Sequence, residues 1–207
     1  MNYCLIDESD PDDFLECEGH VLKTFFASSG IFCAKQSLEL IRKDNHIENS
    51  LKRNKTNYFN IVQFSAHGGY QQPTRTKLAY TSIVKRRGNK KDVEIFRPDS
   101  IVRTGLEADI FLSTNCQTFN PMFIDTFRHY KGISNFIAPV NSPYIGNTLI
   151  FSIMFYNTLL RKVGSTNSRI SDKSIIEAFL QCNAGYKKYC PIDQFRLYNQ
   201  KTNKIYK

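Results

Sequence analysis

The sequence lacks any hydrophobic run long enough to cross a membrane. A membrane helix needs about 20 consecutive apolar residues, and the longest candidate, residues 148–160, is shorter and contains Ser152, Asn157 and Thr158. The N-terminus also lacks the apolar stretch of a signal peptide, because acidic residues begin at Asp7. We therefore expect a protein without membrane contact, located in the reducing cytoplasm.

The chain also lacks paired metal ligands. Cys17 and His20 have a zinc-like spacing, but no second pair follows, and neither Cys182 nor Cys190 has a histidine at ligand spacing. The six cysteines of a cytoplasmic protein are more typical of free thiols than of disulfides. The sequence predicts no structural metal, and we expect no cofactor.

Acidic residues are fewer than basic ones, which gives the chain a formal net charge of +9. The positive residues gather in Lys85–Lys91, between two strand-like runs, and in the tail Lys201–Lys207. Nucleic-acid binding is one interpretation of such clusters. No aromatic residue lies within 85–91 to stack on bases, which favours a solvated hairpin tip and a frayed tail instead.

What is present is an ordinary globular composition and alternating strand and helix patterns. The 207 residues, 41% hydrophobic and 23% charged, suit one α/β domain spanning 1–207. The patterns predict a mostly parallel central sheet covered by helices on both faces, an αβα sandwich with a hairpin inserted after the third strand. Strands are predicted at 3–6, 31–34, 58–64, 78–84, 92–96, 108–112, 133–140 and 194–198, and helices at 11–30, 37–51 (with Ser37 as its cap), 98–105, 121–130, 145–160 and 171–186.

Two short segments carry the candidate chemistry. Ser65-Ala66-His67-Gly68-Gly69 follows the predicted strand 58–64, and Ser113-Thr114-Asn115-Cys116-Gln117-Thr118 follows the predicted strand 108–112. The carboxyl ends of parallel strands meet at one edge of a sheet, where active sites form. The sequence therefore predicts that this edge holds both a histidine and a cysteine.

A histidine beside a cysteine can activate the thiol for nucleophilic attack. An acyl-transfer site also needs donors for the developing oxyanion, and the backbone N–H groups of Gly68 and Cys116 are candidates. Each residue alone has a simpler interpretation, the cysteine as a small core residue and His67 as part of a turn. The joint pattern favours catalysis, whereas His20, His46 and His129 lie in helical patterns.

These segments resemble those of caspase-like cysteine peptidases, and specifically of CHAT domains in the caspase–separase group of clan CD. Caspases place their histidine about 50 residues before the cysteine, and 49 residues separate His67 from Cys116. The CHAT-like pieces are residues 60–68 and 108–118, with weaker likeness in 136–140, 155–156, 174–178 and 195–198.

The resemblance implies His67 as general base, Cys116 as nucleophile and Gly68 as oxyanion donor. It also points to Asn115 as part of the substrate lining, where the family often has a small residue. The family's loop after the next strand often carries an acidic residue that selects a basic substrate side chain. Here this loop is Asn141-Ser142-Pro143-Tyr144, without a carboxylate, and we expect Asn141 and Tyr144 to contact substrate.

Three functions remain open on the sequence alone. The leading hypothesis is a cysteine endopeptidase that cleaves a specific protein partner and is activated from outside by a regulatory protein, with anti-phage or cell-suicide roles suggested by family analogy. The second is a caspase-fold interaction module that cuts nothing. The third is a nucleic-acid-binding regulator that uses the basic hairpin.

Overall fold

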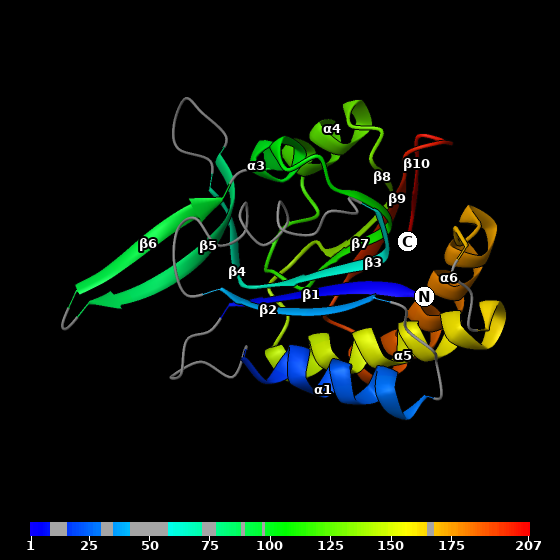
Figure 1. Cartoon of the computed structure of the whole chain (residues 1–207). Coiled ribbons are helices and arrows are strands. Elements are labelled where there is room, and N and C mark those ends of the chain that lie inside the picture. The colour runs from blue at the N-terminus through cyan, green and yellow to red at the C-terminus, as the bar shows by residue number, and fades with distance from the viewer. Residues whose placement is uncertain are drawn as a thin grey trace.

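A seven-stranded sheet forms the centre of the protein (Figure 1). The computed structural model describes residues 1–8, 16–29, 35–41, 58–71, 78–87, 90–96, 98–164 and 168–207, with the backbone alone at some positions, among them 35–41, 67, 78–87 and 90–96. In spatial order the strands are β10 (Lys204–Tyr206), β9 (Phe195–Asn199), β8 (Ile133–Pro139), β7 (Glu107–Ser113), β3 (Tyr58–Ser65), β1 (Asn2–Glu8) and β2 (Lys35–Ile41). The five strands from β8 to β2 are mutually parallel, whereas β9 and β10 are antiparallel to their neighbours.

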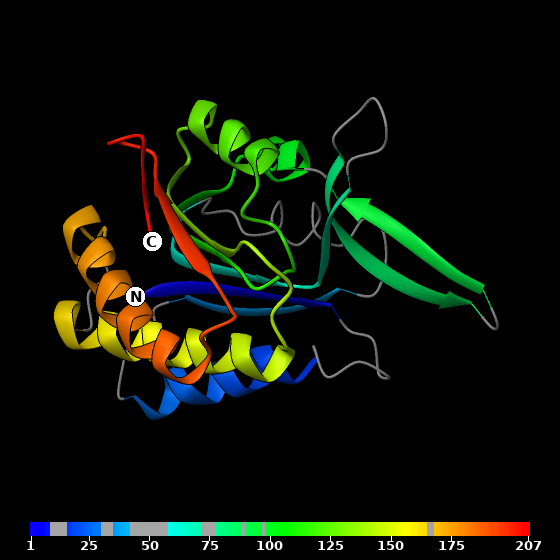
Figure 2. The same cartoon turned by 180° about the vertical axis from the view of Figure 1, so that it is seen from behind.

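Helices cover both faces of this sheet, as Figures 1 and 2 show from opposite sides. One face carries α3 (Pro98–Arg103) and α4 (Pro121–His129), and the other carries α1 (Glu16–Ser28), α5 (Ile145–Val163) and α6 (Asp172–Tyr189). Because successive side chains of a strand point to opposite faces of the sheet, each strand contributes to the hydrophobic cores on both faces. In β7, Phe111 packs toward α4, while Ile110 and Leu112 belong to the core beneath α1 and α5. The predicted three-layer αβα sandwich is confirmed.

A second, three-stranded sheet follows β3 directly. It consists of β4 (His67–Gln71), β5 (Leu78–Arg87) and β6 (Lys90–Phe96), paired antiparallel, and β5 and β6 project away from the large sheet (Figure 1). The predicted hairpin insertion after the histidine strand is therefore confirmed. Gly88 and Asn89 at the centre of the basic cluster, and the side chains around them, lie outside the described part of the chain.

Two predicted features differ in the structure. The helix expected from Ser37 is wrong at its start, because 35–41 is strand β2, parallel to β1 over its whole length. Leu38 and Ile41 have helical spacing, but the free edge of β1 offers backbone partners that a helix would leave unpaired. The strand expected at 31–34, the rest of that helix and the helix start at 11–15 lie outside the described residues.

The C-terminal tail is also more ordered than a frayed end. Lys204–Tyr206 forms β10 against β9, and asparagine side chains hold the connecting turn. Asn199 Oδ1 accepts from the backbone N–H of Thr202 at 2.9 Å, and Asn203, with φ of 52°, accepts from the Tyr198 hydroxyl at 3.0 Å. Asparagine is among the residues that most readily adopt positive φ.

A buried carboxylate anchors the sheet at the end remote from the strand-end segments. Asp109 is 2% exposed and accepts hydrogen bonds from the Tyr58 hydroxyl (2.5 Å), Asn60 Nδ2 (2.9 Å) and the backbone N–H of Ile170 (2.8 Å). Burial raises the pKa of Asp109 despite these donors. The cluster ties β3, β7 and the segment before α6 together.

Asp109→Ala is expected to lower the free energy of unfolding by about 3 kcal/mol, because the Tyr58 hydroxyl and the buried N–H of Ile170 lose their acceptor and Asn60 loses one of its acceptors. Asp109→Asn retains one oxygen and should lose about half as much. Urea denaturation followed by far-ultraviolet circular dichroism measures both values. A loss below about 0.5 kcal/mol for the alanine variant would contradict the anchoring role.

Candidate active site

The two candidate segments lie side by side at the carboxyl ends of β3 and β7. The strands pair in register up to Phe64 and Ser113. Contact continues beyond the strands, because the backbone N–H of Thr114 donates to the Phe64 carbonyl at 3.1 Å and that of Ala66 donates to Asn115 Oδ1 at 2.5 Å. The predicted convergence at one sheet edge is therefore seen in the backbone.

Gly68 lies directly against the backbone of Cys116. A Cβ atom at position 68 would be 2.8 Å from the Cys116 nitrogen and closer still to the Cys116 carbonyl oxygen. Only glycine allows two backbones to approach this closely. His67 is the first residue of β4, pairing with Ser82, so its backbone is adjacent to this contact, whereas its side chain lies outside the described part of the structure.

The turn that carries Cys116 is held by the neighbouring strand β8 and by the loop that follows it. The N–H of Gln117 donates to the Asn141 carbonyl at 2.9 Å, and the N–H of Phe119 donates to the Pro139 carbonyl at 2.9 Å. Gln117 adopts a φ of 56°, a left-handed conformation that costs energy for a residue with a side chain. The strain falls on the residue after the cysteine, which is typical of turns that expose a functional side chain.

The Cys116 thiol is half-buried, and its surroundings favour the neutral form. Burial is the main cause that raises its pKa, and the negative charge of Asp193 adds to it. The Ser142 hydroxyl opposes the shift by hydrogen bonding to the sulfur, as does the backbone of Cys116 itself. A thiol in this environment needs a base before it becomes a nucleophile.

The predicted substrate-contacting residues fall into two kinds of place. Asn115 is fully buried and bridges the two segments through Ala66. Asn141 donates from Nδ2 to the Ile192 carbonyl (2.7 Å) and accepts from the backbone N–H of Gln194 (3.1 Å), which holds the loop before β9. Tyr144 is 82% exposed and is the one of the three whose side chain stands largely free in solvent.

Sequence reasoning missed several residues that support this edge. Asp193 is 4% exposed and accepts from Asn147 Nδ2 at 2.7 Å and from the Tyr186 hydroxyl at 3.1 Å. Ser142 contacts the thiol, and Glu18 reaches the strand ends from α1. No local signal marks them, because a lone acidic residue or serine in a helical or loop pattern is usually a surface residue.

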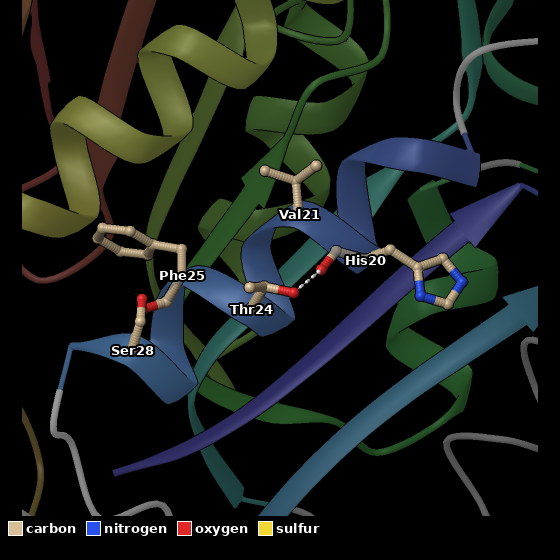
Figure 3. A pocket seen from close by; sticks show the side chains of 5 residues that line it. All are labelled: His20, Val21, Thr24, Phe25 and Ser28. Atoms are coloured by element: carbon tan, nitrogen blue, oxygen red, sulfur yellow. Dashed lines mark hydrogen bonds between the residues drawn. The ribbon is translucent and has the colours of Figure 1, made fainter.

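A pocket on the outer surface of α1 is separate from the strand-end residues. Figure 3 shows its lining, which consists of His20, Val21, Thr24, Phe25 and Ser28. The Thr24 hydroxyl donates to the His20 carbonyl at 3.0 Å.

Within the part of the chain that the structure describes, no group of three His, Cys, Asp or Glu side chains could hold a metal. The described helices include none that is long and apolar enough to span a membrane.

A search of solved structures finds a similar fold. The chain is similar to a secreted C11 cysteine protease from Bacteroides thetaiotaomicron in complex with an irreversible peptide inhibitor, with a TM-score of 0.57 and 13% sequence identity over 97% of this chain and 67% of that chain. No family model matches the sequence, and no curated protein matches it significantly. At this identity the likeness concerns the fold alone, the caspase-like αβα sandwich described above.

Proposed function

We propose that the protein is a cysteine endopeptidase in which Cys116 is the nucleophile and His67 its general base. The observation that carries this proposal is the backbone contact between Gly68 and Cys116. It brings the residue after His67 against the nucleophile at the sheet edge where α/β enzymes hold their active sites. The caspase-like fold shared with a cysteine protease supports the same chemistry.

The proposed reaction proceeds through a thioester. His67 accepts the proton of the Cys116 thiol, and the sulfur attacks the carbonyl carbon of the scissile peptide bond. The N–H groups of Gly68 and Cys116 donate to the oxyanion of the tetrahedral intermediate. The imidazolium then protonates the departing amine, and a water molecule, deprotonated by His67, releases the acid product and restores the thiol.

We assign substrate contact to Tyr144, because it is exposed beside the thiol-contacting Ser142. Asn115 and Asn141 instead hold the surrounding loops through the hydrogen bonds described above.

We further propose that the substrate is a protein and that the chain is of the CHAT type. We also propose that an external regulatory protein activates it, within an anti-phage or cell-suicide system.

Thiol alkylation tests the pair without knowledge of the substrate. A cysteine with a burial-raised pKa is expected to react slowly with iodoacetamide, so rapid reaction requires an activating base. We expect Cys116 to react at least about tenfold faster than the half-buried Cys190 in the same sample at pH 7, and to lose this advantage in His67→Ala. Mass spectrometry of timed digests measures both rates.

Cys190 serves as the internal reference, because it is also a half-buried free thiol. Its rate should be the same in wild type and in His67→Ala. Equal rates for the two cysteines in wild type, unchanged by the substitution, would overturn the pairing of His67 with Cys116. The caspase-fold interaction module would then be the better description.

A further inference from the structure

Glu18 is a buried acid beneath the candidate active site. Its side chain, on α1, is 1% exposed, and among the described residues no Lys, Arg or His forms an ion pair with it. Burial raises its pKa from 4.5 to about 7, against the opposing effect of nearby hydroxyl groups. Burying an acid costs stability, so the position of Glu18 calls for an explanation.

The hydroxyl groups around Glu18 come from the two catalytic segments and from α5. Thr114 Oγ1 lies 3.0 Å from Glu18 Oε2 and 3.0 Å from Ser65 Oγ. Ser65 is two residues before His67, and Thr114 is two residues before Cys116. Thr148 and Ser152 of α5 approach the same carboxyl group. These five residues, which we call the Glu18 network, join α1, α5 and the ends of β3 and β7.

The network can adopt two arrangements that differ by one proton. The ionised carboxylate can only accept, so Thr114 donates its hydroxyl proton to Glu18. The protonated carboxyl must donate, and the Thr114 hydroxyl can then turn to Ser65 Oγ or to the Phe64 carbonyl, 3.5 Å away. Both arrangements use the same atoms at the base of the site.

Glu18 is the titratable group of this network that changes charge near neutral pH. Among the described side chains, Tyr156 of α5 is the other ionisable group that interacts with it. Burial, and the charge of Glu18, raise the pKa of Tyr156 well above its usual range, and its hydroxyl donates to Gln63 Oε1 at 2.6 Å. The remaining described partners, Ser65, Thr114, Thr148 and Ser152, are uncharged.

We propose that Glu18 is a positioning residue of the site, which holds the segments carrying His67 and Cys116 in register and makes their arrangement depend on its protonation. The inference rests on the proposed peptidase function. A residue that costs stability where it joins the two catalytic segments is better explained by function than by packing, because natural sequences break local rules mainly at functional sites.

The stability of the protein tests whether Glu18 titrates as a buried group. Its folded pKa of about 7 lies above the ordinary 4.5, so the folded state binds the proton more tightly than the unfolded state. The contribution of Glu18 to stability is therefore full below about pH 4.5 and is lost as pH rises through 7. Relative to Glu18→Gln, the folding equilibrium constant of wild type should fall by about 150-fold between pH 4.5 and pH 8.

The pH profile of Cys116 alkylation tests the positioning role, which a merely structural residue would not affect. In wild type the rate should show an inflection near pH 7 in addition to thiol ionisation, about threefold in size. Glu18→Gln, which stays neutral, should remove it. Glu177→Gln is the matched control, because this exposed α6 residue pairs only with Lys162 among the described side chains; its profile should match wild type. Identical profiles for Glu18→Gln and wild type would overturn the proposal.

Hydrogen exchange separates this inference from the peptidase proposal. Glu18→Met removes the acceptor but fills the space, and amides 113–118 should exchange about tenfold faster. Thr114→Val should have the same effect, with no further loss in the double variant, because the two residues act through one contact. If Cys116 shows no activation in wild type, the peptidase proposal fails, while unchanged exchange in both single variants would refute the role of Glu18. Should Glu18→Met not fold, Thr114→Val and Glu18→Gln still decide the matter.

Discussion

Replacing Cys116 by alanine is expected to abolish peptide-bond cleavage, lowering kcat/KM by about 10³-fold or more. The sulfur forms the covalent bond to substrate, and alanine offers no substitute nucleophile. His67→Ala should cause a loss of similar size, because the burial-raised pKa leaves the Cys116 thiol protonated without a base. The measurement is the set of new protein N-termini that appear when a cell extract is incubated with each variant.

Cys190→Ala provides the matched control for this experiment. It removes a free, half-buried thiol without altering the segments around His67 and Cys116, and the pattern of cleavage should be that of wild type. The double variant of Cys116 and His67 should be no worse than either single variant, because the pair acts as a unit. Cleavage that persists in Cys116→Ala would show that the activity lies elsewhere.

Gly68→Ala is expected to lower the rate of Cys116 acylation by at least about 100-fold. The added methyl group would lie within van der Waals radii of the Cys116 backbone nitrogen and carbonyl oxygen. Backbone atoms cannot rotate away as a flexible side chain can, so one of the two segments must move. Movement displaces the proposed oxyanion donors together with the nucleophile, and the rate at which new protein N-termini appear in the cell-extract assay, relative to wild type, measures the loss.

Gly146→Ala is the corresponding control. Gly146 lies in the first turn of α5, and a Cβ there meets no atom within 4 Å. Alanine favours helix over glycine by up to about 1 kcal/mol, so this variant should keep its Cys116 rate and be at least as stable as wild type. Equal Cys116 rates in Gly68→Ala and wild type would show that the close backbone approach is not required.

The regular elements around the site followed from local sequence. A buried parallel strand is a continuous apolar run, and the runs 58–64 and 108–112 correspond to β3 and β7. The polar residues that follow each run mark the carboxyl end of the strand. Because the two strands are parallel, His67 and Cys116 come at the same edge of the sheet. The glycine after His67 was predicted as an oxyanion donor, and the structure adds that its lack of a side chain lets the two segments meet.

Where local patterns were ambiguous, the sequence predicted the wrong secondary structure. The segment 35–41 has helical spacing but forms β2, because the exposed edge of β1 supplies partners that no local pattern contains. The basic tail gave no sign that Lys204–Tyr206 would add a strand beside β9. Both outcomes depend on a pairing partner far away in the chain.

The sequence by itself determined the chemistry available at the sheet edge: a thiol, an imidazole and a glycine at the ends of two buried strands. The tertiary structure alone decided what surrounds them. Asp193 and Ser142 act on the thiol from separate loops, and Glu18 reaches Thr114 from a helix 96 residues earlier. Burial and hydrogen bonding between distant segments set the pKa of a side chain, and no local pattern records which segments will meet.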